Sequence, residues 1–139
     1  MYVYAVCRES FRYIVRALYT QCLSAGGDVS VLESIIAHDY KTSGLKGDTR
    51  VALMEQIAAW RRAVPDMHWK IEEMLVDGSR VVVRCEVSGS PVGDFLGLTG
   101  LDGTKRFSIN AIDINMVEDG VIKGRHSVQD WQTAIIQLK

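Results

Sequence analysis

The sequence predicts a single α+β domain in which helices precede a mostly antiparallel sheet. Apolar residues recur with a helical period in the first half of the chain and with a period of two in the second half. Helices followed by a run of strands are typical of α+β proteins, with the helices packed on one face of the sheet. The 139 residues show no linker, repeat or low-complexity segment, so we expect one domain over residues 1–139.

Three helices are expected in the first half. The first presents one apolar face, made by Phe11, Ile14, Val15, Leu18 and Cys22. It should end at residues 25–28, where Gly26 and Gly27 suit a left-handed cap. Ser30 and Glu33 form a capping box for a short second helix that runs to about Ala37.

The segment 41–48 has the composition of a loop, and Asp48 or Thr49 should cap the third helix. The apolar face of that helix consists of Leu53, Ile57, Trp60 and Val64. Pro65 ends the helix because proline has no backbone N–H to donate.

The second half predicts a strand meander. Residues 68–76 form a strand, Asp77 and Gly78 a hairpin turn, and residues 80–88 a strand with strict alternation. One face of that strand carries Val81, Val83, Cys85 and Val87. The glycine-rich segment 89–104 is interpreted as a loop that carries Phe95 and Leu96.

A long strand over residues 105–117 follows, then a turn at 118–120 and a last strand over 121–129. Asp130 should be the N-cap of a short closing helix. The two strands carry apolar residues on both faces, with Ile109, Ala111 and Val117 on one and Ile112, Ile114 and Met116 on the other. A sheet covered on one side only is polar on its second face, so this pattern predicts a homodimer through the sheet.

Composition excludes several classes of protein. The net charge of −1 argues against a nucleic-acid binder. The sequence contains no run of 18 apolar residues, so no membrane helix is expected. The N-terminus lacks the basic region of a signal peptide. Three scattered cysteines favour a reduced, cytoplasmic protein, and three scattered histidines lack metal-ligand spacing, so no metal or organic cofactor is expected.

Asp113 raises a functional question because it lies between two isoleucines in the predicted strand 105–117. Such a carboxylate is a structural buried acid, a catalytic or substrate-binding group, or a solvated surface charge. Its neighbours Ile112 and Ile114 point to the opposite face, and its own face is apolar. An unpaired charge there would be costly, so we expect Asp113 to be buried and to contact Arg125 or His126.

Several motifs together resemble the SnoaL-like polyketide (ester) cyclases, relatives of nuclear transport factor 2 and ketosteroid isomerase. They are "VPDMHWKIEEMLVDGSRVVVR", "GDFLGL", "IDINMVEDGVIKG" and the final "QL", and the similarity runs from about residue 10 to the end. The resemblance implies a cone-shaped fold, in which a curved sheet wraps around the N-terminal helices and encloses an apolar cavity. It also implies cofactor-free acid–base chemistry, in which a cavity carboxylate moves a proton beside a substrate carbonyl.

The chain departs from the family pattern at the reactive positions. Pro91 stands where a histidine is common, and Ser43 lies near the position of another. Residues 124–127 align with the family's "E-H-W-D", so that Ser127 takes the place of the catalytic aspartate. Asp113 falls in the centre of the family's "G-x-D-I" strand.

Two hairpin registers are compatible with the turn at 118–120. A three-residue loop pairs Asp113 with Arg125 and places Ser127 diagonally on the same face, whereas a two-residue loop pairs Asp113 with His126. We favour the first register, because it places Asp113 and Ser127 on the face where the family keeps its reactive groups.

The candidate catalytic residues are therefore Asp113, Arg125 and His126. Candidate cavity or ligand-binding residues are Tyr19, Trp60, Trp69, Phe95 and Ser127, although core packing would also select the aromatic ones. Two hypotheses follow. The chain is a cofactor-free enzyme that cyclises, isomerises or hydrates a small hydrophobic polyketide- or terpenoid-like substrate, or it is a non-catalytic ligand-binding or dimerisation module.

Overall fold

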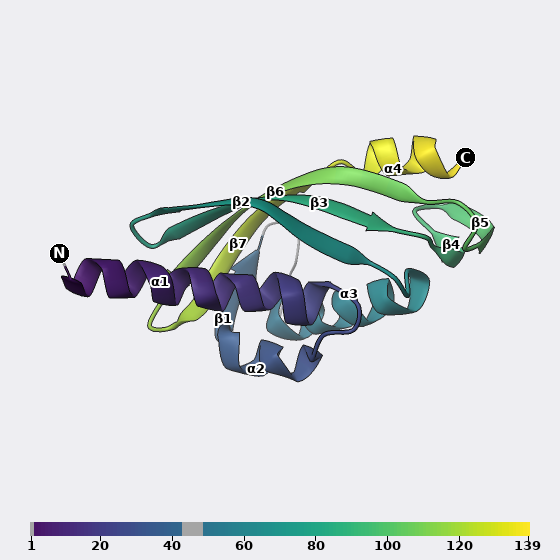
Figure 1. Cartoon of the computed structure of the whole chain (residues 1–139). Coiled ribbons are helices and arrows are strands. Elements are labelled where there is room, and N and C mark those ends of the chain that lie inside the picture. Colours follow the sequence, from purple (N-terminus) through teal and green to yellow (C-terminus); the bar gives the residue numbers. More distant parts are fainter. Residues whose placement is uncertain (1, 43–48) are drawn as a thin grey trace.

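The computed structural model describes residues 2–42 and 49–139 and confirms an α+β fold. Side chains are described for residues 9–42 and 50–139. Figure 1 shows a curved sheet that arches over α1, with α2 and α3 on the same side as α1 and α4 beside the end of the sheet. Ser43 and the predicted cap Asp48 lie outside the described residues.

The five-stranded sheet has the order β1-β7-β6-β3-β2, and β4 and β5 form a separate two-stranded sheet. All pairings are antiparallel except that of β1 with β7. The helical segments are α1 (Tyr2–Ala17), η1 (Leu18–Leu23), η2 (Val29–Val31), α2 (Leu32–Ile35), α3 (Thr49–Ala63) and α4 (Trp131–Leu138). The strands are β1 (Ile36–Thr42), β2 (His68–Asp77), β3 (Arg80–Gly89), β4 (Val92–Phe95), β5 (Leu98–Asp102), β6 (Phe107–Glu118) and β7 (Val121–Gln129).

The predicted apolar face of the first helix is confirmed, but the helix changes type before it ends. Val15, Leu18 and Cys22 are fully buried. From Leu18 the chain continues as the π-helical segment η1, and the Ser24 N–H donates to the carbonyl of Tyr19 at 3.1 Å. Such wider turns are frequent at functional sites, and this one carries Tyr19.

The short second helix is present as predicted, but its capping box was predicted wrongly. Asp28 is the N-cap, because its Oδ1 accepts from the Ser30 backbone N–H at 3.0 Å and from the Ser30 hydroxyl at 2.6 Å. The Ser30 hydroxyl is thereby engaged with Asp28. The helix ends at Ile35, and the chain turns at once into strand β1, which the sequence did not reveal.

The glycine-rich segment is also ordered more regularly than predicted. Instead of a loop it forms the hairpin β4–β5, which turns at Leu96 and Gly97 with φ angles of 54° and 79°. Left-handed angles at both central residues match the right-handed twist of a hairpin. Phe95, directly before the turn, is buried.

The remaining predicted helices and strands are confirmed, and the β2–β3 hairpin turns at Gly78 and Ser79, one residue after the predicted Asp77 and Gly78. The faces of β3 and α3 pack into the core, where Val81, Val83, Cys85, Val87, Leu53, Ile57 and Val64 are at most 1% exposed. Asp130 caps α4 by accepting from the Thr133 N–H at 3.2 Å and from its hydroxyl at 2.6 Å. None of the described helices is long and apolar enough to cross a membrane.

Candidate active site

The β6–β7 hairpin decides which side chains face the helices. Asp119 and Gly120 form a two-residue turn with φ angles of 54° and 75°. Val117 pairs with Ile122 but Met116 pairs with Gly124, so Lys123 is an extra residue that makes a β-bulge. The bulge moves the pairing by one residue, and Asp113 lies directly opposite Ser127.

Both predicted registers were therefore wrong, although the face preferred for Asp113 and Ser127 was right. Arg125 pairs with Asn115 and lies diagonal to Asp113. His126 pairs with Ile114 on the other face and is exposed. The structure separates His126 from the carboxylate, which corrects the predicted grouping of Asp113, Arg125 and His126.

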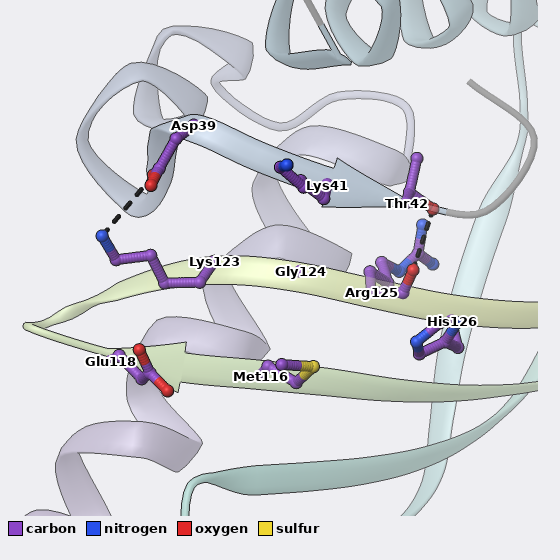
Figure 2. Close-up of a pocket in the computed structure, with 9 residues that line it drawn as sticks. All are labelled: Asp39, Lys41, Thr42, Met116, Glu118, Lys123, Gly124, Arg125 and His126. Atoms are coloured by element: carbon purple, nitrogen blue, oxygen red, sulfur yellow. Dashed lines mark hydrogen bonds and ion pairs between the residues drawn. The ribbon is translucent and has the colours of Figure 1, made fainter. Parts of the chain in front are cut away.

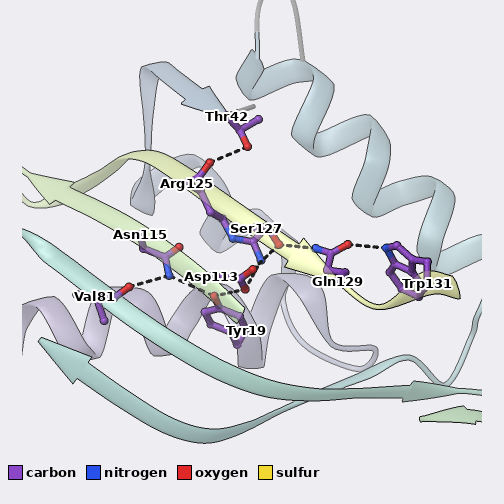
Figure 3. A network of polar contacts seen from close by, with 9 residues as sticks. All are labelled: Tyr19, Thr42, Val81, Asp113, Asn115, Arg125, Ser127, Gln129 and Trp131. Atoms are coloured by element: carbon purple, nitrogen blue, oxygen red, sulfur yellow. Dashed lines mark hydrogen bonds and ion pairs between the residues drawn. The ribbon is translucent and has the colours of Figure 1, made fainter. Parts of the chain in front are cut away.

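Asp113 is completely buried and accepts hydrogen bonds at both carboxylate oxygens (Figure 3). Oδ2 accepts from Arg125 Nη2 at 2.7 Å and from the Tyr19 hydroxyl at 2.6 Å. Oδ1 accepts from the Ser127 hydroxyl. The predicted burial of Asp113 and its contact with Arg125 are confirmed.

A chain of hydrogen bonds fixes the direction in which the Ser127 hydroxyl points. The indole N–H of Trp131 can only donate, and it donates to Gln129 Oε1 at 2.7 Å. The Gln129 amide nitrogen therefore faces Ser127 and donates to its oxygen at 2.7 Å. The Ser127 proton is left for Asp113, so this contact favours an ionised carboxylate.

A second chain fixes the Tyr19 hydroxyl in the same way. Asn115 Nδ2 donates to the Val81 carbonyl at 3.3 Å and to the Tyr19 oxygen at 3.2 Å. The Tyr19 proton is then directed at Asp113. Together with the Arg125 guanidinium, three donors converge on one carboxylate, an arrangement complementary to its charged form.

Arg125 carries the balancing charge in a buried aromatic setting. It is 4% exposed, and its guanidinium carbon lies 5.6 Å from the ring centre of Tyr19 and 5.8 Å from that of Trp69. Burial lowers the pKa of Arg125, but its electrostatic interactions with Tyr19, Asp113 and Tyr40 outweigh burial and raise the pKa above its ordinary value. Arg125 therefore stays protonated.

Burial raises the pKa of the Tyr19 phenol well above its ordinary value, against the opposing effect of Arg125. The folded protein holds this proton more tightly than the unfolded chain does, so the contribution to stability is complete below the ordinary pKa of 10.0 and is lost as the pH rises above it.

We expect Tyr19→Phe to remove part of the alkaline loss of stability, measured by urea unfolding between about pH 9 and 11. Tyr13→Phe, at an exposed tyrosine, is the control. An unchanged alkaline slope in Tyr19→Phe would contradict this assignment.

Three polar atoms in this cluster have no hydrogen-bond partner among the described residues. They are the N–H groups at Trp69 Nε1 and Arg125 Nε and the oxygen Asn115 Oδ1. The orientation of the Asn115 amide is set by its bond to the Val81 carbonyl, so the oxygen is the free atom. Buried polar atoms without partners are rare in folded proteins and mark places where another molecule can bind.

The predicted aromatic residues fall into two connected groups. Trp69 is fully buried, and its ring centre lies 6.1 Å from that of Tyr19 and 5.8 Å from that of Trp60. Phe95 belongs to the second group, with Phe107 and Trp131. Trp60 joins the groups, because its ring centre is 6.1 Å from that of Trp131. The apolar cavity that the resemblance implies stays a prediction.

His126 and Arg125 both line a surface pocket of about 510 Å³ over β1, β6 and β7 (Figure 2). Charged side chains line much of it, and Lys123 Nζ lies 3.5 Å from Asp39 Oδ1. Asp113 does not line this pocket. Within residues 9–42 and 50–139, no three His, Cys, Asp or Glu side chains are grouped as metal ligands would be.

Four members of the polar cluster were not predicted from the sequence: Asn115, Gln129, Trp131 and Tyr40. Asn115 is two residues from Asp113 and Gln129 two residues from Ser127, so the strand period was a usable signal for both. Trp131 was assigned only to the closing helix. Tyr40 lies on β1, a strand that was not predicted.

The SnoaL-like polyketide cyclase family matches residues 13–138 of the chain. The chain belongs to this family. Comparison with curated proteins gave no match. Among solved structures, this SnoaL-like chain is similar to TsrD from Streptomyces laurentii, with 26% sequence identity and a TM-score of 0.80. The similarity covers 94% of this chain and 96% of TsrD.

Two further structures share the fold of this SnoaL-like chain. IdmH from Streptomyces antibioticus, assigned to the polyketide cyclases, is 23% identical over 92% of this chain and 97% of IdmH, with a TM-score of 0.77. AclR from Streptomyces galilaeus, assigned as a hydroxylase, is 17% identical over 96% of this chain and 81% of AclR, with a TM-score of 0.74. The fold is therefore shared by proteins assigned to different reactions.

Proposed function

We propose that this SnoaL-like chain is a cofactor-independent enzyme that moves a proton next to a carbonyl group of a small, hydrophobic, polyketide-like substrate. Asp113 would be the base. The observation that carries this proposal is a buried carboxylate that is hydrogen-bonded as an ion in the protein interior, beside an aromatic wall formed by Tyr19 and Trp69. Cyclisation, isomerisation and hydration all include such a proton transfer.

One lone pair of Asp113 remains for chemistry. A carboxylate has about four lone-pair positions, and the three donors found among the described residues leave one of them open, on Oδ1, which accepts only from Ser127 there. In the reaction, Oδ1 would take a proton from the carbon next to the carbonyl. The electron pair of the broken C–H bond would move to the carbonyl oxygen and form an enolate.

Ser127 has a different role from the aspartate that the family resemblance places at its position. Its hydroxyl donates to Asp113 and accepts from Gln129, so it holds Oδ1 in a fixed orientation. Arg125 balances the charge of Asp113 before the transfer and favours the enolate afterwards.

Hydrogen–deuterium exchange of a simple ketone tests the proposal without knowledge of the natural substrate. The probe is 2-acetylnaphthalene, a flat ketone whose methyl group exchanges only through its enol or enolate. In D₂O the protein should accelerate loss of the methyl proton signal, followed by NMR, relative to buffer. Exchange at the buffer rate, with the ketone shown to be bound, would exclude the proposed chemistry.

A non-catalytic pocket protein is the second candidate. Asp113 is completely enclosed and forms an ion pair with Arg125, which also suits a purely structural role. Such a protein would bind the ketone without promoting exchange, so the same experiment separates the two functions.

We also propose a homodimer through the outer face of the sheet. Ile112, Ile114 and Val128 lie there on the adjacent strands β6 and β7 and are 51%, 36% and 76% exposed. Neighbouring apolar side chains of this kind are typical of an interface.

We expect a dimer in sedimentation equilibrium at micromolar concentration, and we expect Ile112→Lys to shift it towards monomer. Ile136→Lys is the matched control, because Ile136 is also an exposed isoleucine but lies on α4, outside this face. A wild-type monomer would contradict the proposal.

A further inference from the structure

Two N–H groups without a partner among the described residues lie deep in the protein, on Trp69 and on the Arg125 side chain that holds Asp113. Trp69 is 1% exposed and Arg125 is 4% exposed, yet neither Trp69 Nε1 nor Arg125 Nε has an acceptor among the described residues. A buried N–H group that gives up its bond to water needs another acceptor. The two groups therefore need an acceptor oxygen that the described residues do not supply.

The two donors belong to neighbouring, well-fixed side chains. The Arg125 guanidinium carbon lies 5.8 Å from the Trp69 ring centre. Nη2 of the same guanidinium is held by Asp113 at 2.7 Å, which sets its orientation. Trp69 is held by its ring contacts with Tyr19 and Trp60 and by its backbone N–H, which donates to Ser24 Oγ at 2.9 Å.

The charge balance of the cluster selects the kind of oxygen. The positive charge of Arg125 is matched by Asp113, and Tyr19 is neutral. A ligand carboxylate would therefore add a negative charge that nothing in the cluster balances, and an unbalanced buried charge is unfavourable. A ketone or ester carbonyl brings an acceptor without a charge.

We propose that Trp69 Nε1 and Arg125 Nε form a binding site for the carbonyl oxygen of a neutral, flat ketone or ester, and that this site discriminates against the free carboxylic acid. This inference rests on the proposed function and names its substrate class. Since one guanidinium contacts both Asp113 and the bound oxygen, it brings the carbon next to the carbonyl towards the base.

Indole NMR signals provide a direct test with the full-length protein. The chain has three tryptophans, and Trp131 already donates to Gln129, so its indole N–H is an internal reference. Adding 2-acetylnaphthalene should move the Trp69 indole proton downfield in a saturable way and leave that of Trp131 in place. The hydrocarbon 2-ethylnaphthalene has the same shape without the oxygen and should not produce the downfield shift.

Binding constants complete the test. 2-Naphthoate, which carries a carboxylate in place of the ketone, should bind more weakly than 2-acetylnaphthalene. Trp69→Phe keeps a ring but removes the N–H, and it should weaken ketone binding by about 2- to 10-fold more than it weakens binding of 2-ethylnaphthalene. The wild-type comparison of the three probes stands even if the variant folds poorly.

Three results would overturn the inference: naphthoate binding as tightly as the ketone, ketone binding that leaves the Trp69 indole signal unmoved, or no ketone binding up to its solubility limit. These failures differ from failure of the proposed function. Ketone binding at Trp69 without deuterium exchange would reject only the proposed chemistry. Exchange without any change at Trp69 would reject only this carbonyl site.

Discussion

Replacing Asp113 with asparagine is expected to lower the rate of deuterium exchange into 2-acetylnaphthalene by about 10²–10⁴-fold. Asparagine has nearly the same shape and can still accept hydrogen bonds from Tyr19 and Arg125. It has no basic carboxylate oxygen, so the proton of the ketone has no acceptor at this position. The measurement is the decay of the methyl proton signal in D₂O at equal concentrations of folded protein.

The matched control is Asp94→Asn, which removes an exposed carboxylate on β4 and should keep the wild-type rate. Ketone binding by Asp113→Asn, followed at the Trp69 indole, shows that the site is still formed. Wild-type exchange in Asp113→Asn would mean that another group, or no group of the protein, takes the proton.

Replacing Arg125 with methionine should lower the free energy of unfolding by about 3–5 kcal/mol. Methionine fills a similar volume but leaves the completely buried Asp113 without its positive partner. Urea unfolding at neutral pH measures the loss. The same change removes the cation that lies against the Tyr19 and Trp69 rings, which adds to the effect.

The double variant Asp113→Asn/Arg125→Met separates charge from packing. Neither charge is then left alone, so the double variant should be more stable than Arg125→Met. The cycle of single and double variants gives the interaction energy of the pair. If the two losses simply add, the buried ion pair is not the origin of the instability.

Sequence patterns predicted the helices and strands in which buried residues recur with one regular spacing along most of the element. Strand β3 alternates without interruption, and α3 keeps one apolar stripe, so both were predicted. Strand β1 was missed because it is an edge strand with an irregular register and no strict alternation. The β4–β5 hairpin was missed because glycines at its turns resemble a loop in composition.

Only part of the candidate site could be predicted from the same patterns. A carboxylate between two isoleucines correctly marked Asp113 as buried. Its partners on β7 depended on register, and the bulge at Lys123 has no clear signature in the sequence. The π-helical turn that carries Tyr19 was equally hidden, because its apolar residues continue the stripe of α1.

The extra residue in β7 bears on how this interior could arise or change. If Lys123 paired with Met116 instead of bulging, the two-residue turn would pair Asp113 with His126, and Arg125 and Ser127 would project from the opposite surface. The bulge therefore decides whether an imidazole, or a guanidinium and a hydroxyl, lies beside Asp113. Deletion of Lys123 would remove the bulge and keep Asp113 opposite Ser127, so the chemistry of this interior depends on the register of the hairpin and not on the length of β7.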